Sequence, residues 1–476
     1  MAVSVIQYPF YNQMPAGTDW MYALTSTNTT GNYKFKFFVD VYIGQFGSQY
    51  IIRLKFSPNA LGTGIINMSD IFEQYVKTTN LGNATTGNES SFKSVDNIAG
   101  SECPIHCIDK QSLNNDSASK AVLGWGEEYS TNPNDAPTEY IFQAISLNLT
   151  FFNGMTYNNE QVRTSLGYAL DLSNWDNKSR LMTSIISLFL TDAPPTEFTA
   201  VANPTAQRIR STDYATLAFL NGKYSAGNSF PGKVNVSFYN DSNTLLQSNQ
   251  INISAANGGH NATNDLLITD SHESLLFIGV GVANLAGAGI NLPANTAYYN
   301  IYLQANNNVP NSRAMRYNIQ SNDCKGYETI RLTWLNKYGA WDYYNFTKKS
   351  IRSTNIKRTK YSKIKGEWNK DKFIKNGFDR GASTLNINAV ENITINSDWF
   401  TTDSEAAWLE QLFISTEVYI LGELILSDTA PAEYGKYLTP VMITNKEYVK
   451  YTRANDKVAQ YEIDIEYSIN KRVHSA

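Results

Sequence analysis

The chain has 476 residues, a formal net charge of −4 and a charged fraction of only 17%. That length exceeds one ordinary domain and indicates about three. The slightly acidic balance excludes a surface covered by a basic field for nucleic acid. The 30 Tyr and 22 Phe favour pleated, half-buried strands. The composition therefore predicts a mainly β protein, with several antiparallel β-sandwich-like domains and a few short helices.

The sequence contains no segment typical of export or of membrane insertion. Residues 1–10 lack a basic region and a long apolar core, so we expect no signal peptide. The most apolar run, 275–292, contains four Gly and two Asn and falls short of a membrane span. We therefore expect synthesis in the cytosol and no membrane partner.

The first elements predicted along the chain form a hairpin. Residues 33–43 alternate apolar and polar side chains, and residues 50–56 do so again after a Gly-containing turn. Ser69 is placed to cap a short helix over 70–76. Residues 77–137 are rich in Asn, Ser, Gly and Asp and predict a long loop insertion. We assign 1–154 to an N-terminal β domain.

Three cysteines raise the question of a metal site. Cys103 and Cys107 flank His106 in the string ECPIHC, and Cys324 lies far away. Zinc motifs usually add a second Cys/His pair, and none follows here. We expect reduced thiols, with neither a metal nor another cofactor.

The middle region, 155–325, continues the strand pattern. Apolar runs at 233–240, 275–285 and 297–304 lie between Asn/Gly/Ser clusters, which is typical of an antiparallel sandwich. An apolar strand that runs into an Asn-led turn recurs along the chain, at 149–154, 217–222 and 332–339. We interpret the recurrence as shared strand-to-turn chemistry, with internal duplication as the alternative.

The C-terminal domain, 326–476, carries the clearest helix signal. Thr402 and Glu405 form a capping box ahead of an apolar run, which predicts a helix over 402–414. Strands are predicted after it, at 439–444, 446–451 and 460–467.

The stretch RLTWLNKYGAWDYYNF, Arg331 to Phe346, is dense in aromatic residues. We predict a structural corner there, in which Gly339 takes a positive φ and Asp342 accepts backbone N–H bonds across the turn. The residues of this corner are Trp334, Asn336, Gly339, Trp341 and Asp342. The alternative is a stacking platform for sugars or bases, which needs exposed rings.

A strongly basic segment follows, residues 348–375, here named the basic arm. It holds eleven Lys/Arg against Glu367 and Asp371, a formal charge of +9 that leaves −13 for the rest of the chain. Three interpretations stay open: a solvated hairpin whose lysines protect an edge, a docking arm for an acidic neighbour, or a nucleic-acid strip.

For the docking arm, the predicted contact residues come from the arm and from the last strand. The acidic surface would lie in a neighbouring subunit or in the same chain. The candidate residues are Lys357, Arg358, Lys360, Lys363 and Lys365 on the arm, and Glu462, Asp464 and Glu466 on the strand.

Catalytic motifs are absent from the sequence. The four histidines (His106, His260, His272 and His474) lie in no HExxH, GxSxG or comparable frame, and no phosphate-binding glycine loop occurs. Carboxylate pairs that meet only in space stay open. We expect a protein that is not an enzyme.

Several strings together resemble the virion structural proteins of tailed bacteriophages, in the tail or baseplate-like apparatus. They are FKFFVDVYI, the motif LNxxGxxDxxxF at 335–346, the helix segment SDWFTTDSEAAWLEQLF, and the endings PVMITNKEYVKY and YEIDIEYS. The resemblance covers most of the chain and implies a building block of the tail, baseplate or collar. It would be made in the host cytoplasm and contact other virion proteins and copies of itself. No catalytic residue is implied.

The residues alone leave a second function open. A receptor- or glycan-binding β-sandwich protein on a virion or cell surface would present Trp341, Tyr343 and Tyr344 beside a groove, with loop 77–137 lining it.

Overall fold

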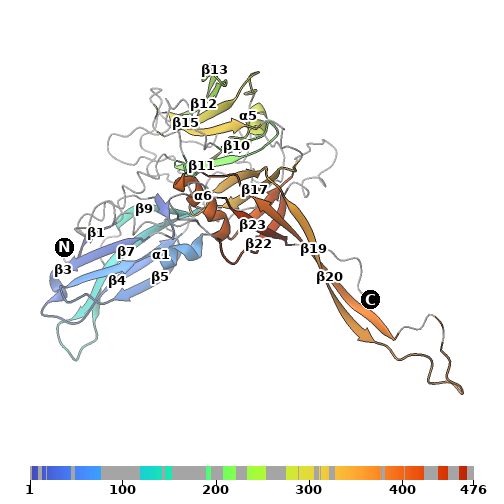
Figure 1. The fold of residues 1–476 in the computed structure, drawn as a ribbon. Helices are drawn as coiled ribbons and strands as arrows, with labels where there is room; N and C mark the ends of the chain where they lie inside the picture. Colours follow the sequence, from blue (N-terminus) through green and yellow to red (C-terminus); the bar gives the residue numbers. More distant parts are fainter. Residues whose placement is uncertain are drawn as a thin grey trace, which may run out of the picture. The chain divides into compact units, whose positions relative to one another are not determined.

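The computed structural model describes residues 3–8, 13–17, 19–43, 49–76, 118–141, 145–152, 189–194, 207–220, 233–252, 275–287, 289–304, 310, 312, 314–320, 327–375, 377, 381–400, 402–422, 438–448 and 460–468. These residues confirm the predicted class: strands dominate, most sheets are antiparallel, and the helices are few and short (Figure 1). The chain forms two compact units, Met1–Ser321 with Leu335–Tyr343, and Asn322–Trp334 with Tyr344–Ala476. The division into three domains stays a prediction.

Two sheets pack face to face in the N-terminal part of unit 1. The smaller has the order β1-β3-β6, and the larger has the order β2-β9-β7-β4-β5, with β8 beside β7. Between them the rings of Tyr22 and Trp125 lie 5.1 Å apart. The strands are β1 (Val3–Gln7), β2 (Gln13–Pro15), β3 (Met21–Ser26), β4 (Tyr33–Ile43), β5 (Gln49–Phe56), β6 (Thr63–Asn67), β7 (Ala118–Ser130), β8 (Thr138–Ile141) and β9 (Ile145–Phe152).

The predicted hairpin of this region is confirmed, since β4 pairs antiparallel with β5. The short helix is also present, as α1 (Ser69–Phe72) and a 3-10 turn, η3 (Glu73–Tyr75). Ser69 does not cap it, which corrects the prediction. Met68 is the N-cap residue, and the Ser69 N–H donates to Oδ1 of Asn67 at 3.1 Å, so Asn67 satisfies the first backbone donor.

The long loop predicted at 77–137 is wrong at its C-terminal end, because residues 118–130 form β7. This strand pairs with β4 and β9 inside the larger sheet. Its Gly126 lies opposite Phe38, whose ring would lie 2.1 Å from a Cβ placed on that glycine. The glycine that suggested a loop is therefore the residue that lets a buried aromatic ring cross the strand.

The middle part of unit 1 contains a five-stranded sheet, ordered β10-β16-β15-β12-β13, and a two-stranded sheet of β11 and β14. The hydroxyl of Tyr299 on β15 donates to the carbonyl of Val280, just after β14, at 2.8 Å. The elements are β10 (Gln207–Ile209), β11 (Thr216–Leu220), β12 (Lys233–Tyr239), β13 (Leu245–Asn252), β14 (Leu275–Gly279), α5 (Val282–Gly287), β15 (Tyr298–Gln304) and β16 (Met315–Ile319).

The apolar run 275–285 was predicted as one strand, and the structure corrects this. The strand ends at Gly279 and helix α5 begins at Val282. Asn284 stabilises the change of direction, because its Oδ1 accepts the backbone N–H groups of Ala215 and Gly281 at 2.9 and 3.1 Å.

Unit 2 is built on a seven-stranded sheet with the order β18-β17-β21-β22-β23-β20-β19. Helix α6 (Asp403–Ile414) confirms the predicted helix, and Thr402 accepts the Glu405 N–H as its cap. The predicted strand 446–451 is not formed over its described residues, 446–448. The strands are β17 (Ile330–Leu335), β18 (Trp341–Phe346), β19 (Ile351–Ser362), β20 (Ala382–Asn396), β21 (Val418–Leu421), β22 (Leu438–Ile443) and β23 (Glu462–Tyr467).

Gly126→Ala tests the packing of Phe38 across β7. We expect a loss of stability of about 1–3 kcal/mol, because a methyl group would overlap the buried ring. Thermal unfolding of the purified chain measures it. Gly124→Ala is the matched control, since a Cβ there meets its nearest atom at an ordinary 3.6 Å. Equal effects of the two substitutions would contradict this account.

Candidate functional site

One hairpin turn recurs three times among the described residues and includes the predicted corner. An Asn side chain opens each turn, and its Oδ1 accepts the backbone N–H groups two and four residues later, at 2.8–3.1 Å. The fourth residue has a positive φ: Gly62 at 79°, Asn243 at 59° and Gly339 at 77°. The three opening residues are Asn59, Asn240 and Asn336. Each of these turns is closed by its own Asn side chain. Of the three Asn-led turns predicted from the sequence, the one at 332–339 has this geometry, and the Asn residues of the other two, at 149–154 and 217–222, lie outside the described residues.

The positive φ predicted for Gly339 is confirmed, but the role predicted for Asp342 belongs to Asn336. Asp342 instead accepts the Thr191 hydroxyl at 2.7 Å, and the Asn336 amide donates to the Leu190 carbonyl at 2.8 Å. Both contacts bind the turn to a segment about 150 residues earlier. We name this turn and its contacts with residues 190–192 the clasp, and all of these residues belong to unit 1.

A third contact strengthens the clasp. Asp192 accepts the Tyr338 hydroxyl at 2.5 Å and pairs with Lys337. Burial, with the Asp192 carboxylate as a further cause, raises the pKa of Tyr338 well above its usual range. The phenol therefore stays a hydrogen-bond donor at ordinary pH.

The aromatic rings of this stretch are buried. Trp334 is fully buried and packs on Trp408 of α6 with ring centroids 5.4 Å apart, and Trp341, Tyr343 and Tyr344 are all less than 8% exposed. A stacking platform needs open rings. These residues therefore do not form the stacking surface that the alternative reading requires.

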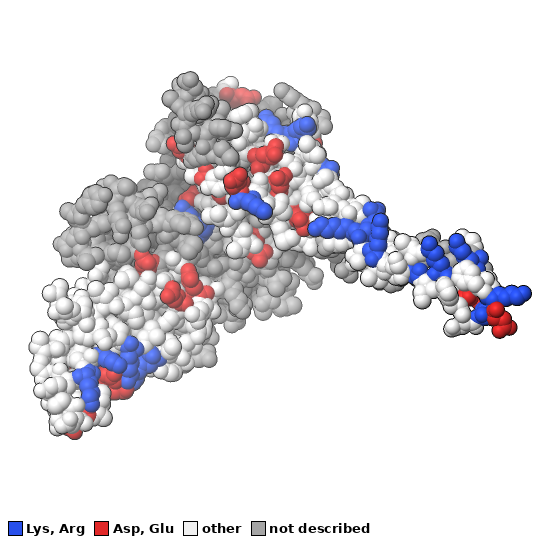
Figure 2. Space-filling view, turned by 60° about the horizontal axis from the view of Figure 1, so that its bottom comes forward, with Lys and Arg blue, Asp and Glu red and all other residues white. Residues whose placement is uncertain are grey.

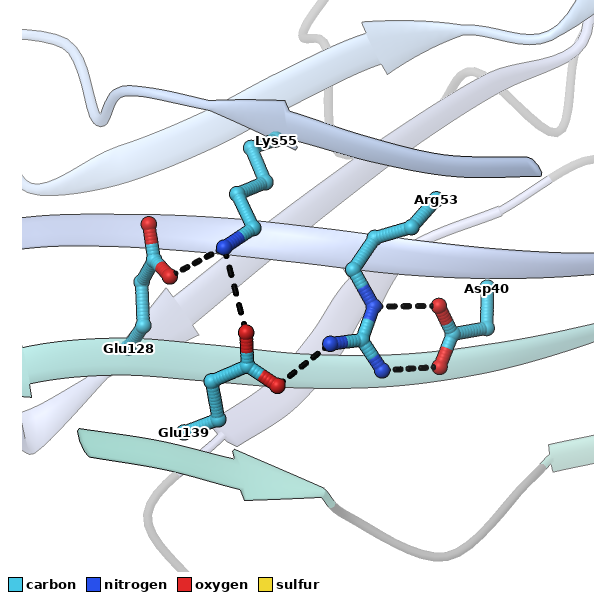
Figure 3. A network of polar contacts seen from close by, with 5 residues as sticks. All are labelled: Asp40, Arg53, Lys55, Glu128 and Glu139. Carbon is cyan, nitrogen blue, oxygen red and sulfur yellow. Dashed lines mark hydrogen bonds and ion pairs between the residues drawn. The ribbon is translucent and has the colours of Figure 1, made fainter. Parts of the chain in front are cut away.

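A network of five charged residues lies on the larger N-terminal sheet (Figure 3). Arg53 holds Asp40 with two hydrogen bonds, of 2.6 and 2.8 Å, and also pairs with Glu139. Lys55 bridges Glu139 and the buried Glu128 at 3.1 and 2.5 Å. The guanidinium also lies 4.2 Å from the centre of the Phe38 ring.

Each charge in the network has an opposite partner, and the pKa shifts follow from that. Hydrogen bonds from Arg53 and Lys55 lower the pKa of Glu139, and those to Asp40 and Glu128 raise the pKa values of Arg53 and Lys55 respectively. The network thus links β4, β5, β7 and β8 through charges that all have an opposite partner. Sequence reasoning missed it, although the hairpin register places Asp40 opposite Arg53.

Strands β19 and β20 form an antiparallel pair that extends beyond the rest of the unit 2 sheet (Figure 1). On the other side of β20, β23 pairs only with Asn392–Asn396. Nothing in the described chain buries β19, whose residues are exposed almost throughout. We name β19 and β20 together the ribbon.

The basic arm includes β19 and the segment beyond it, and its cations fall into two groups. Near the start of the ribbon Lys348 pairs with Asp398 at 3.2 Å and Arg352 with Glu328 at 2.7 Å. Further out, Lys357, Arg358 and Lys360 are exposed and make no ion pair with a described residue. Figure 2 shows Lys and Arg distributed along this projection.

The remaining predicted arm residues, Lys363 and Lys365, are also exposed. The Lys363 ammonium lies 5.7 Å from the ring centre of Tyr361, and its hydrogen bond lowers the pKa of that phenol. Beyond them, Trp368 and Phe373 pack edge to face at 5.3 Å yet remain 71% and 57% exposed. The outer arm thus combines Lys363 and Lys365, which make no ion pair with a described residue, one ion pair between Lys370 and Glu367 at 3.7 Å, and exposed aromatic surface.

The predicted acidic residues lie on one face of β23. Glu462 is exposed and Asp464 and Glu466 are half-buried, while the alternate Ile463 and Ile465 are buried in the core. None of the three carboxylates pairs with a cation among the described residues, although Asp464 accepts the Thr394 hydroxyl at 2.6 Å. We name Glu462, Asp464 and Glu466 the acidic strip. The structure does not bring it to the arm cations within one chain.

Cys103, His106, Cys107 and Cys324 lie outside the described residues, and the described ones contain no group of three or more potential metal ligands. No described helix is long and apolar enough to cross a membrane.

No protein-family model and no curated protein matches this sequence. Among solved structures, the tail of an empty GTA particle with C6 symmetry aligns at 12% identity over 33% of this chain and 99% of that chain, with a TM-score of 0.17. Native E. coli alpha-2-macroglobulin aligns at 7% identity over 83% of this chain and 22% of that chain, with a TM-score of 0.17. Salmonella alpha-2-macroglobulin reacted with methylamine aligns at 8% identity, over 97% and 29%, with a TM-score of 0.15. TM-scores this low do not establish a shared fold.

Asn336→Ala tests the clasp. It leaves two buried N–H groups and the Leu190 carbonyl without partners, so we expect a loss of about 2–4 kcal/mol in thermal unfolding. Asn240→Ala is the matched control. Asn240 opens the same turn at a half-buried position, and the backbone N–H groups of Ser242 and Thr244 that it satisfies are exposed, so water replaces the lost bonds. A smaller loss for Asn336→Ala than for Asn240→Ala would refute the clasp.

The network predicts an acid-sensitive N-terminal sheet. The folded-state pKa of Glu139 is below its ordinary 4.5, so its contribution is present above that value and is lost as the pH falls through the lower, folded value. We expect the melting temperature of wild type to decline below about pH 4.5 more steeply than that of Glu139→Gln. Melting curves followed by Trp fluorescence between neutral and acid pH provide the measurement. If the melting temperatures of wild type and Glu139→Gln fall equally with pH, Glu139 is not the cause of the acid sensitivity.

Proposed function

We propose that this chain is a non-enzymatic structural component of a tailed-phage virion, assembled by protein–protein contacts in the tail, baseplate or collar. The observation that carries the proposal is the ribbon with its basic arm. A two-stranded ribbon is marginally stable in water by itself. This one also exposes Ile356 and Ile387, besides the unpaired Lys357, Arg358 and Lys360. Such a surface gains stability when a neighbour covers it.

The resemblance of the sequence strings to tailed-phage virion proteins supports the same proposal, as does the mainly β fold with its tertiary clasp. We include no catalytic role, because the described charged cluster of unit 1 is closed by opposite charges. The partners would be other virion proteins and copies of this chain, and the location would be the virion after synthesis in the host cytoplasm.

The glycan-binding alternative loses the observation on which it depended, because Trp341, Tyr343 and Tyr344 are buried. The loop predicted to line the groove lies outside the described residues over 77–117. No described feature favours this second function.

Particle composition tests the proposed function. Particles purified by density gradient from the source lysate are analysed by peptide mass spectrometry, and an antibody against the purified chain is used for immunogold electron microscopy. We expect the chain at a fixed ratio to the other particle proteins and gold at one defined part of the particle. An abundant soluble host protein, followed in parallel, controls for carry-over. A chain found only in the soluble fraction would overturn the proposal.

A further inference from the structure

We propose that the basic arm of one copy binds the acidic strip of a second copy of this chain. Arg358 and Lys360, which share one face of β19, would face Glu462, Asp464 and Glu466, and Lys357 on the other face would add to the positive charge of the arm. This inference deepens the proposed structural function and rests on it, because it names the partner and the contact by which assembly occurs.

Both halves of the contact are present and unused in one chain. The three arm cations and the three strip carboxylates make no ion pair with a described residue, although other charges nearby do, such as Arg352 with Glu328. The arm is +9 and the rest of the chain is −13. A second copy therefore offers the opposite charge to this arm.

The register of the sheet keeps the two halves apart within one chain. The strip pairs with β20 only at Asn392–Asn396, whereas Lys357 lies opposite Asn388 and Lys360 opposite Thr384. At about 3.3 Å per residue, the cations lie roughly 13 and 26 Å further along β20, and β19 is two strands, about 10 Å, to the side of β23. Those separations exceed what a Lys–Glu pair spans, so the strip of the same chain is not the partner.

The dimensions of the two surfaces agree. Both are extended strands, and Arg358 and Lys360 lie two residues, about 7 Å, apart, as do successive carboxylates of the strip. Apolar surface accompanies the charge on each side. Ile356 and Arg358 project from the same face of β19, with Ile387 opposite Arg358, and Met442, 50% exposed, lies opposite Glu466. The contact would pair charges around a small apolar centre.

Several charges must act together, because a single exposed ion pair contributes little. The contact also joins two different surfaces of the chain. Two copies can therefore bind each other reciprocally, each arm on the strip of the other copy, and form a closed dimer. Alternatively, each copy binds the next in a head-to-tail series, which forms a ring or a helical stack.

A charge-swap experiment on the full-length chain tests the contact. One variant carries Lys357→Glu, Arg358→Glu and Lys360→Glu, and the other carries Glu462→Lys, Asp464→Lys and Glu466→Lys. Sedimentation velocity at physiological salt measures self-association. We expect wild type to associate and each variant to associate at least about tenfold more weakly. An equimolar mixture of the two variants should recover association, because each reversed surface then meets its complement.

Circular dichroism of each variant shows whether it remains folded. Gln247→Glu, at an exposed position on β13 away from the arm, controls for added negative charge. The inference is overturned if wild type is monomeric, if the arm variant associates normally, or if the mixture of folded variants fails to recover. It is also overturned if the arm instead binds a single-stranded oligonucleotide in fluorescence polarisation and the strip variant associates like wild type.

These outcomes are distinct from failure of the proposed function. A chain that is present in purified particles but does not recover in the mixture would keep its place in the virion and lose this contact. A chain that recovers in the mixture but is absent from particles would keep the contact and lose the virion function.

Discussion

The architecture of unit 2 depends on where the pairing of β23 with β20 ends. From Asn392 to Thr394, β20 has paired strands on both sides, and β23 continues beside Ile395 and Asn396. Ile393 and Ile395 are buried there. Outward of Asn392 only β19 continues beside it, so both faces of the ribbon meet water and none of its residues there is buried. The exposure of the arm, its unpaired cations and its separation from the acidic strip all follow from this one register.

Local signals in the sequence were sufficient for the elements that local chemistry determines. The alternation over 33–43 defined β4, and the capping box at Thr402 located the start of α6 within one residue, because a cap and a strand period depend only on neighbours. Gly339 was recognised as the residue of positive φ for the same reason. The density of Lys and Arg over 348–375 identified the arm, although not its length beyond the sheet.

Elements whose form depends on distant partners were beyond sequence reasoning. Strand β7 looked like part of a loop, and one of its glycines, Gly126, makes room for Phe38, a residue almost 90 positions earlier. Asn336 and Asp342 were both placed at the turn, but the Leu190 carbonyl and Thr191 hydroxyl that assign their roles lie about 150 residues away. The periodicity of the sequence does not indicate such a contact. The sequence therefore identified the residues of the turn correctly, but it assigned to Asp342 the backbone hydrogen bonds that Asn336 accepts.

The charged residues of the chain fall into two kinds: those paired within the N-terminal network, and those on the ribbon that are exposed. In the N-terminal network, cations and carboxylates neutralise each other and two of the carboxylates, Asp40 and Glu128, are buried, so salt screens them only weakly. On the ribbon, Lys357 and its neighbours are exposed and open, and salt screens such charges within about 10 Å. Raising the ionic strength should therefore weaken the proposed contact between two copies while leaving each copy folded. With the contact that we propose, the chain would fold first, stabilised by its internal ion pairs, and would then assemble through the charges that have no ion-pair partner among its described residues.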